Sequence, residues 1–371
     1  MKFTFTQSSM AKGLQKVMGA VSNKAPIPSL SNLHLMLDGS SLKMTGTDLD
    51  LTITAEVEVI EVEGEGGVLV NAKRFQEIIR ELPDVPLEMN VQDGNVVLSG
   101  TGIGNYTIPA GNISDYPDIP KVDPQFSFDL TADVLRRVIT KTIFAVSHDE
   151  MRPILTGLLI QLRPDELRVV ATDGHRLARI VRHDINYQGE PRDVTVPMKA
   201  LNLLMKNLSD DDQPVIGIAQ SRASFKTATQ TLITRLIDGN YPKYEGVIPT
   251  SNPGKLLAGI DELISAVKRV SIFASQLSRQ IKFKVDNATV EITADDPESG
   301  ARGEETISCE YTGDPLLIAY NATYLMDILR QIDTEEVIFE LATSNDGAII
   351  KPTSQRDGED FIMLLMPIRL R

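Results

Sequence analysis

The chain has 371 residues, of which 42% are hydrophobic, enough to fill the cores of two or three domains of ordinary size. A single cysteine, Cys309, excludes an intramolecular disulfide framework and, with four scattered histidines, leaves little material for a metal site. The net charge of −14 argues at first sight against a polyanionic partner, because lysine and arginine drive binding to nucleic acid. No apolar leader and no run of about 18 apolar residues occurs, so we expect a soluble, cytoplasmic protein that does not enter a membrane.

The first third of the chain alternates predicted strands and helices. A short strand begins at Phe3, an amphipathic helix is predicted over residues 8–22, and alternating β-branched segments follow with a hairpin tip at Gly39. A second amphipathic helix is predicted over residues 71–82, and further strands lead to a proline-rich linker over residues 116–124. This order predicts an α+β unit whose two helices cover one face of antiparallel sheet.

The same order of elements occurs twice more. Helices are predicted over residues 131–147 and 197–208 in the second copy, and over residues 260–275 and 321–332 in the third. The second helices of the three copies align without gaps, with apolar residues at i, i+3, i+4 and i+7: Phe75, Ile78, Ile79 and Leu82; Leu201, Leu204, Met205 and Leu208; Leu325, Ile328, Leu329 and Ile332. A second proline-rich linker, residues 241–253, separates the last two copies. The pattern predicts three repeated domains, at 1–122, 123–250 and 251–371.

The first helices of the three copies match only with gaps. In this alignment the run Leu14–Val17 corresponds to Leu135–Val138 and to Val267–Val270. The opening strands also correspond, at Phe3 and at Phe126.

Positive charge is concentrated on the predicted helices. They contain 13 lysines and arginines but only six acids, although the whole chain has 51 acids against 37 bases. Arg80, Lys206 and Arg330 occupy one position of the three second helices, away from the apolar stripe. For a single helix the simpler interpretation is a solvated face, because lysine and arginine are good helix formers. Recurrence in three copies favours a positive surface that holds phosphates without reading sequence.

Five segments of the chain resemble one known family. They are MKFT at the start, TGTDLD at Thr45–Asp50, ATDGHRLAR at Ala171–Arg179, IDGNYPKYEGVIP at Ile237–Pro249 and MPIRL at Met366–Leu370. With the three copies, they resemble the bacterial DNA polymerase III beta subunit over the whole chain. The resemblance implies a DNA clamp fold, a head-to-tail homodimeric ring with helices lining the inside and sheets outside. It also implies a sliding clamp that encircles duplex DNA without sequence specificity, catalyses no reaction and uses no cofactor or metal.

Such a ring makes the helical cations candidates for contact with DNA. Lys12 with Lys16, and Arg137 with Lys141, are i, i+4 pairs that we expect on exposed helix faces. In the following loop Pro153-Ile154 replaces an aromatic pair of some relatives, so base stacking is not expected there. The DNA-facing residues predicted are Lys12, Lys16, Lys24, Lys73, Arg80, Arg137, Lys141, His148, Arg152, Lys199, Lys206 and Arg330.

The resemblance also implies a groove between the second and third domains that takes short linear motifs. Its partners would be the DNA polymerase III alpha subunit, clamp-loader subunits, other polymerases and repair proteins. The matching residues are Leu155, Thr172, Gly174, His175, Arg176, Leu177, Pro242, Val247, Leu364, Leu365, Met366, Pro367 and Arg369. They suit an apolar pocket with a polar rim, in which Gly246 replaces an arginine common in the family. The final strand is expected to end before Met366.

The subunit interface is predicted to depend on packing. The family commonly pairs bases with acids here, but residues 103–108 of this chain contain no base. Tyr106 and Ile108 would pack on Ile272 and Phe273, an apolar patch that nothing in its own chain is expected to cover. The interface residues predicted are Arg74, Tyr106, Ile108, Ile272, Phe273, Glu298 and Glu304.

Two other functional classes remain open at this point. Asp173 and His175 could form an acid–base pair, but the matching turns of the other copies keep only the aspartate and no nucleophile motif accompanies it. We therefore expect Asp173 to bond the backbone of a repeated turn. A repeat-built enolpyruvyl transferase is another candidate enzyme, but it would gather its charges at one cleft, whereas these bases are spread over all three copies. The second class that remains open is a protein scaffold. No phosphate-binding glycine loop is present, so no nucleotide cofactor is expected.

Overall fold

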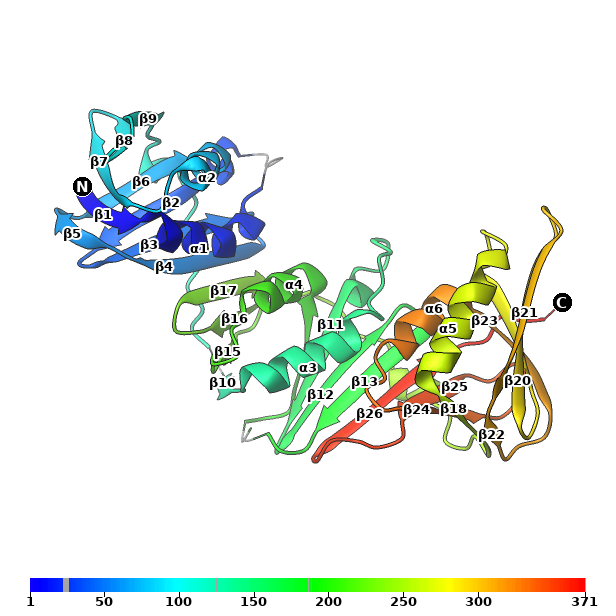
Figure 1. The fold of residues 1–371 in the computed structure, drawn as a ribbon. Coiled ribbons are helices and arrows are strands. Elements are labelled where there is room, and N and C mark those ends of the chain that lie inside the picture. The colour runs from blue at the N-terminus through cyan, green and yellow to red at the C-terminus, as the bar shows by residue number, and fades with distance from the viewer. Residues whose placement is uncertain (23–26, 125, 186, 188, 371) are drawn as a thin grey trace. The chain divides into compact units, whose positions relative to one another are not determined.

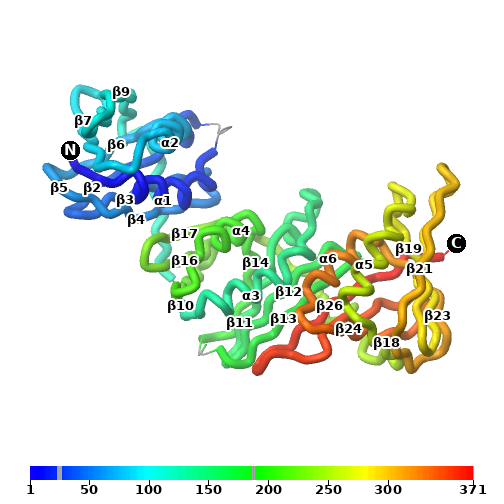
Figure 2. Tube along the Cα trace, in the orientation of Figure 1, coloured from blue at the N-terminus to red at the C-terminus, as the bar shows by residue number. Residues whose placement is uncertain are grey.

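The computed structural model describes residues 1–22, 27–124, 126–185, 187 and 189–370. The chain forms two compact units: unit 1 comprises Met1–Leu135 and Lys199–Leu236, and unit 2 comprises Arg136–Met198 and Ile237–Arg371. Figure 1 shows their helices and strands, and Figure 2 follows the same elements along the Cα trace. Lys24, one of the predicted DNA-facing residues, lies outside the described residues.

Unit 1 holds two antiparallel sheets and three helices. The five-stranded sheet has the order β5-β1-β7-β8-β9, with β1 Lys2–Thr6, β5 Ile60–Glu63, β7 Pro86–Gln92, β8 Asn95–Gly100 and β9 Tyr106–Pro109. The eight-stranded sheet has the order β10-β15-β16-β17-β4-β3-β2-β6, with β2 Asn32–Asp38, β3 Ser41–Thr47, β4 Leu51–Glu58, β6 Gly66–Asn71, β10 Phe126–Asp129, β15 Val215–Ile218, β16 Arg222–Lys226 and β17 Gln230–Arg235. Its helices are α1 Gln7–Val17, α2 Ala72–Glu81 and most of α4 Met198–Asn207.

Unit 2 is built in the same way. The nine-stranded sheet has the order β14-β11-β12-β13-β26-β25-β24-β18-β22, with β11 Gly157–Arg163, β12 Glu166–Thr172, β13 Arg176–Arg182, β14 Arg192–Pro197, β18 Gly254–Gly259, β22 Glu310–Tyr311, β24 Glu336–Leu341, β25 Ala348–Pro352 and β26 Glu359–Leu365. The four-stranded sheet has the order β21-β20-β19-β23, with β19 Gln280–Val285, β20 Thr289–Asp296, β21 Ala301–Ser308 and β23 Leu316–Asn321. Its helices are most of α3 Ala132–Ile143, with α5 Ile260–Val270 and α6 Ala322–Leu329.

Each copy of the repeat supplies two groups of four strands. The groups that open and close a copy are β1-β7-β8-β9, β10-β15-β16-β17 and β18-β24-β25-β26; the middle groups are β6-β2-β3-β4, β14-β11-β12-β13 and β23-β19-β20-β21. Successive copies share a sheet where these groups meet: β4 pairs with β17 at junction 1, in unit 1, and β13 pairs with β26 at junction 2, in unit 2. The sheets therefore do not stop at the predicted domain boundaries, because backbone hydrogen bonds join each copy to the next.

All six predicted helices are present among the described residues, but they are shorter than predicted. The first helices α1 and α5 end in 3-10 turns, Met18–Ala20 and Ser271–Phe273. Asn71 and Asn321 start α2 and α6, because their side-chain oxygens accept hydrogen bonds from backbone N–H groups of the first turn. The predicted apolar stripes face the core; Phe75 of α2, for example, is fully buried.

The predicted alignment of the first helices is wrong by one turn for the second copy. The helices align without gaps, from Gln7 in α1, Ala132 in α3 and Ile260 in α5. The buried positions then coincide: Met10, Leu135 and Leu263, followed by Leu14, Ile139 and Val267. A shift of one turn keeps an apolar stripe in phase, so the pattern alone does not detect it. As a result Lys12 corresponds to Arg137, and Lys16 to Lys141 and Arg269.

An aspartate turn recurs in all three copies. The Oδ1 atom of Asp48 accepts hydrogen bonds from the backbone N–H groups two and three residues later, at 3.1 and 2.7 Å. Asp173 Oδ1 does the same at 2.8 and 3.0 Å, and Asp296 Oδ1 accepts the N–H two residues later at 3.3 Å. These bonds confirm that Asp173 belongs to a repeated structural turn.

His34 is a buried titratable residue of β2. Its ring lies 5.4 Å from that of Tyr116, and its Nδ1 atom has no hydrogen-bond partner among the described residues. Because burial disfavours the charged imidazolium, the pKa of His34 is lowered from 6.5. The folded chain therefore keeps His34 neutral at pH values at which the unfolded chain protonates it.

We expect unit 1 to lose stability as the pH falls through the ordinary histidine pKa, because the unfolded chain then binds a proton that folded His34 excludes. His34→Leu should remove this part of the pH dependence. Thermal unfolding between about pH 5.5 and about pH 7.5 measures it. His148→Gln, which changes an exposed histidine, is the control and should keep the dependence of the unmodified chain. An unchanged pH dependence in His34→Leu would show that another group titrates.

Candidate functional site

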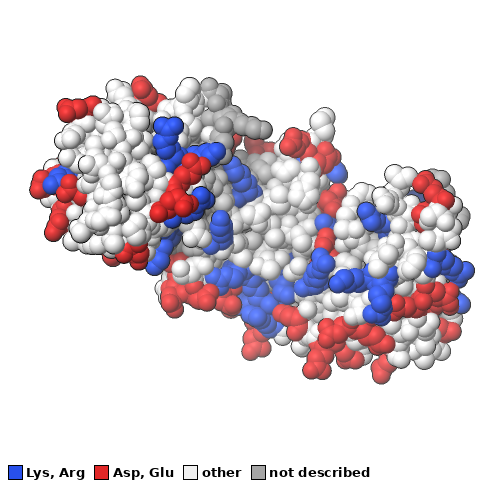
Figure 3. Space-filling model, turned by 45° about the horizontal axis from the view of Figure 1, so that its top comes forward, with Lys and Arg blue, Asp and Glu red and all other residues white. Residues whose placement is uncertain are grey.

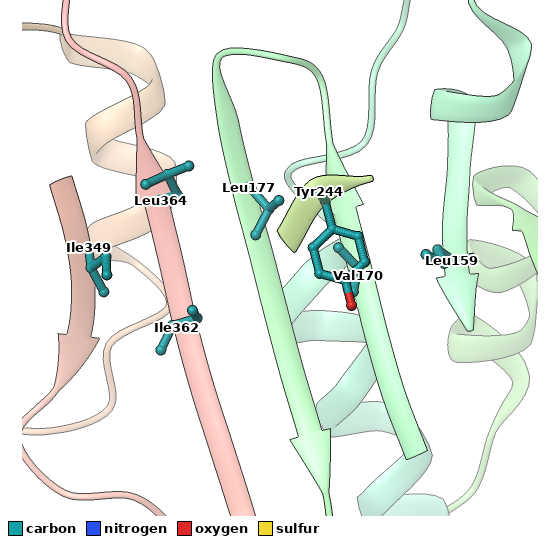
Figure 4. Close-up of a cluster of buried hydrophobic side chains, with 7 residues drawn as sticks. All are labelled: Leu159, Val170, Leu177, Tyr244, Ile349, Ile362 and Leu364. Atoms are coloured by element: carbon teal, nitrogen blue, oxygen red, sulfur yellow. The ribbon is translucent and has the colours of Figure 1, made fainter. Parts of the chain in front are cut away.

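A cluster of apolar side chains covers one face of the nine-stranded sheet in unit 2. It consists of Leu159, Val170, Leu177, Tyr244, Ile349, Ile362 and Leu364, and Tyr241 and Ile248 pack against it. Figure 4 shows that these side chains come from neighbouring strands and from the segment of Tyr244. Leu177 and Leu364 are direct cross-strand partners in β13 and β26, so the cluster crosses junction 2.

The structure brings some of the predicted groove residues from distant parts of the chain to this face. Leu177 and Leu364 form part of the cluster, and Leu155 is buried on a short 3-10 helix directly before β11. Val247 and Met366 remain 57% and 38% exposed, on the segment of Tyr244 and directly after β26. Together they give a buried apolar floor with exposed apolar side chains beside it, which suits an anchor side chain of a peptide.

The turn between β12 and β13 forms the adjoining polar edge. Thr172 Oγ1 donates a 2.7 Å hydrogen bond to the carbonyl of Arg176, and Gly174 has a φ of +92°, which favours glycine. The carbonyl of His175 accepts the backbone N–H of Met366 at 2.9 Å, which ties the C-terminal segment to this turn. As predicted, the final strand ends before Met366, at Leu365.

Two of the predicted groove residues have side chains on the opposite, helical side of the sheet. Arg176 and Leu365 are register partners whose sequence neighbours form the floor, and side chains alternate along a strand. Arg176 donates to Asp173 at 3.1 Å and to Asp327 of α6 at 2.6 Å, and its guanidinium lies 4.6 Å from the ring centroid of Tyr324. Arg176 thus fastens the turn to α6. Pro242, Pro367 and Arg369 lie in the two segments that flank the cluster.

The apolar cluster contains residues that sequence reasoning missed. Val170, Ile349 and Ile362 stand in continuous apolar runs of β12, β25 and β26, which indicate burial but not the face to which each side chain points. Tyr241 and Tyr244 lie in the motif at Ile237–Pro249, but nothing in the sequence shows which side of the chain they face.

Both tyrosines are held by hydrogen bonds at the edge of the cluster. The hydroxyl of Tyr241 accepts the backbone N–H of Thr172 at 3.1 Å, and Tyr244 donates to Gln161 at 2.7 Å and accepts from Arg168 at 3.2 Å. Burial raises the pKa of both tyrosines above the ordinary value, so both hydroxyls stay protonated in the physiological range.

Most of the predicted DNA-facing side chains are exposed. They are Lys12, Lys73, Arg80, His148, Arg152, Lys199, Lys206 and Arg330. Lys199 pairs with Asp48 at 2.5 Å and Arg80 with Glu81 at 3.0 Å, whereas Lys12 and Lys206 make no ion pair with another described residue. In the right half of Figure 3 lysine and arginine side chains form a band with acidic side chains below it. Lys268 of α5, which sequence reasoning missed, is a further exposed helical cation.

The prediction that Arg137 and Lys141 face DNA is wrong. They are only 9% and 8% exposed, on the side of α3 that packs in unit 2. Arg137 donates two parallel 2.6 Å hydrogen bonds to the fully buried carboxylate of Glu359 and a third, 2.8 Å, to Asp333. Lys141 donates to the carbonyl of Gln331 and lies 3.6 Å from Asp333. An i, i+4 spacing fixes a shared helix face but does not show whether that face meets water or a neighbouring element.

The pKa values of this group follow from its pairing. Burial opposes the charge on Arg137, but its hydrogen bonds to Glu359 and Asp333 outweigh burial and raise its pKa. Burial lowers the pKa of Lys141, although Asp333 opposes this. Burial favours the neutral acid at Asp333, but Arg137 and Lys141 hold its pKa below the ordinary value.

Lys16, the counterpart of Lys141, is also partly drawn into a junction. Its ammonium donates a 2.6 Å hydrogen bond to Thr229, next to β17, and its carbonyl accepts from Asn207 at the end of α4. Burial lowers the pKa of Lys16. The ammonium of Lys16 is therefore already engaged within unit 1 and is less accessible to a phosphate than that of exposed Lys12.

Two sheet edges carry the predicted interface residues. Among the described strands, β9 ends the five-stranded sheet and β21 ends the four-stranded sheet. Tyr106, Ile272 and Phe273 are 38%, 77% and 37% exposed, as the predicted patch requires. Ile108 is the exception at 1%, because its side chain points from β9 into the core of its own copy. The predicted patch therefore has three exposed members.

The charged interface candidates are exposed too. Arg74 lies on α2, and Glu298 follows the aspartate turn at Asp296. Glu304 on β21 pairs with Arg302 at 2.7 Å.

Models of one protein family match the chain along almost its whole length. They describe the DNA polymerase III beta subunit: its N-terminal domain at residues 1–120, its central domain at 129–243 and its C-terminal domain at 245–369. The chain belongs to the DNA polymerase III beta subunit family. This membership confirms the predicted family, the α+β clamp fold and the sliding-clamp function.

Individual members of the beta subunit family agree in length and structure. The beta sliding clamps of Pseudomonas aeruginosa and Vibrio cholerae are 32% and 30% identical, and each alignment covers 100% of both chains. The solved structure of the Pseudomonas aeruginosa sliding clamp bound to griselimycin has a TM-score of 0.94 at 31% identity, and that of the Bacillus subtilis clamp 0.94 at 26%, both over 100% of both chains. In the described part of this family member, no helix is long and apolar enough to cross a membrane, and no three His, Cys, Asp or Glu residues are placed to hold a metal ion.

Proposed function

We propose that the chain acts as a head-to-tail homodimeric sliding clamp, without catalysis of its own, that encircles duplex DNA and tethers polymerases to it. The observation that carries the proposal is an unfinished sheet. Two junctions join strand groups within the chain, and one group of each kind is left over, ending at β9 and at β21. Unpaired sheet edges favour further pairing, and a second copy offers the complementary edge. Two chains joined twice in this way close a ring of six domains.

The two internal junctions supply the register of the proposed contact. Thr52 pairs with Ile233 at junction 1, and Leu177 pairs with Leu364 at junction 2. Within the repeat, Arg302 holds the place of Thr52 and Leu177, and Thr107 the place of Ile233 and Leu364, as their own cross-strand partners show. We therefore infer that Arg302 faces Thr107 of the second copy, which sets Gly303 opposite Tyr106.

Packing supports this register. A side chain at Gly303 would collide with the ring of Phe273, so Phe273 lies directly over that position. Tyr106 corresponds to Leu232 and Met363, both of which are buried in the internal junctions. In the proposed dimer, Tyr106 of one copy therefore packs against the ring of Phe273 of the other copy.

Charge supports the contact as well. At junction 1 the aspartate turn pairs with α4 through Asp48 and Lys199. The corresponding residues of the third junction are Asp296 and Lys73 of the second copy. Arg74 and Glu298, two of the interface residues predicted from the sequence, lie beside them. We also propose domains at 1–122, 123–250 and 251–371, and a cytoplasmic location, since the proposed partner is cellular DNA.

The helical cations support contact with the phosphate backbone. Lys12, Arg80 and Lys206 are exposed on three helices of unit 1, α1, α2 and α4, while acids dominate the chain as a whole. Long cationic side chains on a wide surface bind phosphates irrespective of base sequence. The apolar groove at junction 2 is proposed to hold linear motifs of the polymerase alpha subunit, clamp-loader subunits, other polymerases and repair proteins.

The proposed register predicts one specific cross-link. In a Cys309→Ser background, mixing an Arg302→Cys chain with a Thr107→Cys chain should give an intermolecular disulfide in high yield under mild oxidation, because directly opposed Cβ atoms lie within reach. Non-reducing electrophoresis measures the yield. A Glu304→Cys chain, two residues out of register on the same face, replaces Arg302→Cys as the control. Equal yields for both pairs would disprove the register, and a monomer by sedimentation would disprove the ring.

The ring predicts topological retention on circular DNA, and its cations predict a salt-dependent association with DNA of any sequence. After loading, the clamp should stay on a closed circle and leave when the circle is cut. Gel filtration with labelled protein measures this retention.

Changing Lys12, Arg80 and Lys206 together to glutamate should weaken DNA association for all sequences. Each lost phosphate contact should flatten the logarithmic salt slope by about 0.9.

The matched control changes three cations on the outer sheet face of unit 1, Lys43, Lys226 and Arg235, to glutamate. This variant carries the same change in net charge and should keep the slope of the unmodified chain. If both variants lose the same slope, only net charge matters and the helical cations have no special role.

The groove predicts a local loss of peptide affinity. Val247→Ala and Met366→Ala remove exposed apolar surface beside the floor, and together they should weaken a fluorescent clamp-binding-motif peptide by about 2 kcal/mol. Fluorescence anisotropy measures the affinity. Point changes are preferable to removing residues 366–371, because the N–H of Ile368 also bonds the carbonyl of Ala319. Leu317→Ala, an exposed leucine elsewhere in unit 2, is the control; equal affinities for all variants would place the site elsewhere.

A further inference from the structure

A buried network of charges joins α3, β13 and β26 on the helical side of junction 2. Its centre is Glu359, whose carboxylate is fully buried, accepts two 2.6 Å bonds from Arg137 and lies 3.4 Å from Arg182. Arg182 is itself held by Asp184, and Arg137 by Asp333. Arg182 and Glu359 are register partners at one end of the strand pair, and the guanidinium of Arg137 links that end to α3.

The other end and the other face of the same strand pair form the peptide groove. Leu177 and Leu364 are register partners five residues away from Arg182 and Glu359, and an odd separation puts side chains on opposite faces of a strand. The same two paired strands therefore connect the charged end to the floor of the proposed groove, although the network itself lies on the other face.

Among the described residues, the network is present at junction 2 and absent from junction 1 and from the two edges of the proposed contact between copies. At junction 1 the corresponding residues are Lys12, Val57 and Ala228, which cannot form it. At the proposed contact between copies they are Ser265, Ile307 and Gly102, which carry no charge. Burying ionised groups is costly, and apolar side chains in their place often stabilise a protein at least as well, so fold stability alone does not account for the network.

We propose that Arg137, Arg182 and Glu359 are positioning residues that hold β13 against β26 in the geometry that the peptide groove requires. The inference rests on the proposed peptide-binding function of junction 2. The network limits the motion of the two floor strands before the peptide arrives, so less ordering is left for binding to bring about. Its loss should appear mainly as faster peptide dissociation.

The test compares Glu359→Gln with the unmodified chain. The substitution keeps the size of the side chain but leaves Arg137 and Arg182 buried without their shared counter-charge. Affinity and dissociation rate of the clamp-binding-motif peptide are measured by anisotropy and stopped flow, at a temperature where circular dichroism shows both chains fully folded. We expect roughly tenfold weaker binding, carried by the dissociation rate. A residue that only stabilised the fold would lower the unfolding temperature and leave the affinity of the folded chain unchanged.

Two further variants complete the experiment. Arg137→Lys keeps the positive charge but cannot make two parallel bonds to the carboxylate, so it should give a smaller loss and serves if Glu359→Gln does not fold. Asp50→Asn breaks an exposed ion pair with Arg235 at junction 1 and should change nothing. If the unmodified chain binds the peptide and Glu359→Gln and Arg137→Lys bind it equally well, the positioning role is disproved. If the unmodified chain does not bind it at all, the groove proposal itself fails.

Discussion

The rest of the structure depends on one interaction, the antiparallel pairing between the last strand of a copy and the edge strand of the middle group of the preceding copy. These pairs are β17 with β4 and β26 with β13. This pairing is made twice within the chain, through seven register pairs at β13 and β26 and five at β4 and β17. Backbone polar groups at a sheet edge need hydrogen-bond partners, and each copy of the repeat has two strand edges without a partner of their own. The edge of the middle group of one copy pairs with the last strand of the next copy. Sheets that continue from one copy into the next follow from this one pairing.

Local pattern predicted most of this architecture, and non-local pairing produced the rest. The six helices and the three copies were predictable because a stripe such as Phe75 to Leu82 records burial directly in the sequence. The sharing of sheets between copies was not, because strand partners far apart in the chain leave no periodic signal. The prediction that Arg137 and Lys141 are exposed was wrong for the same reason. The pattern shows that they lie outside the apolar stripe of their helix, but it cannot show their partners Glu359 and Asp333, which lie about 200 residues away in the sequence. The prediction that Ile108 belongs to the exposed patch was wrong for a related reason, because a side chain of an edge strand can still point into the core of its own copy.

The acidic net charge and the proposed hold on DNA are compatible because binding depends on local charge. Lys199 and Arg80 are partly neutralised by Asp48 and Glu81, whereas Lys12 and Lys206 have no such partner among the described residues. A phosphate competes poorly for a paired lysine and well for a free one. The strength of the positive surface is therefore set by which helical cations the junctions use for themselves, and Lys16 shows that this use is graded.

The side chains over the two internal junctions differ, and this difference is why we propose a peptide groove at junction 2 and not at junction 1. At junction 1 the places of Leu159, Val170 and Leu177 are taken by His34, Thr45 and Thr52. Two hydroxyl pairs satisfy each other there, Thr45 with Thr54 at 2.9 Å and Thr47 with Thr52 at 2.8 Å. An apolar anchor gains about 25 cal/mol for each Å² of apolar surface that it buries, and a floor of paired hydroxyls offers little such surface. Repetition supplies the same strand pairing at each junction, and the side chains decide which junction offers the apolar floor that the proposed groove requires.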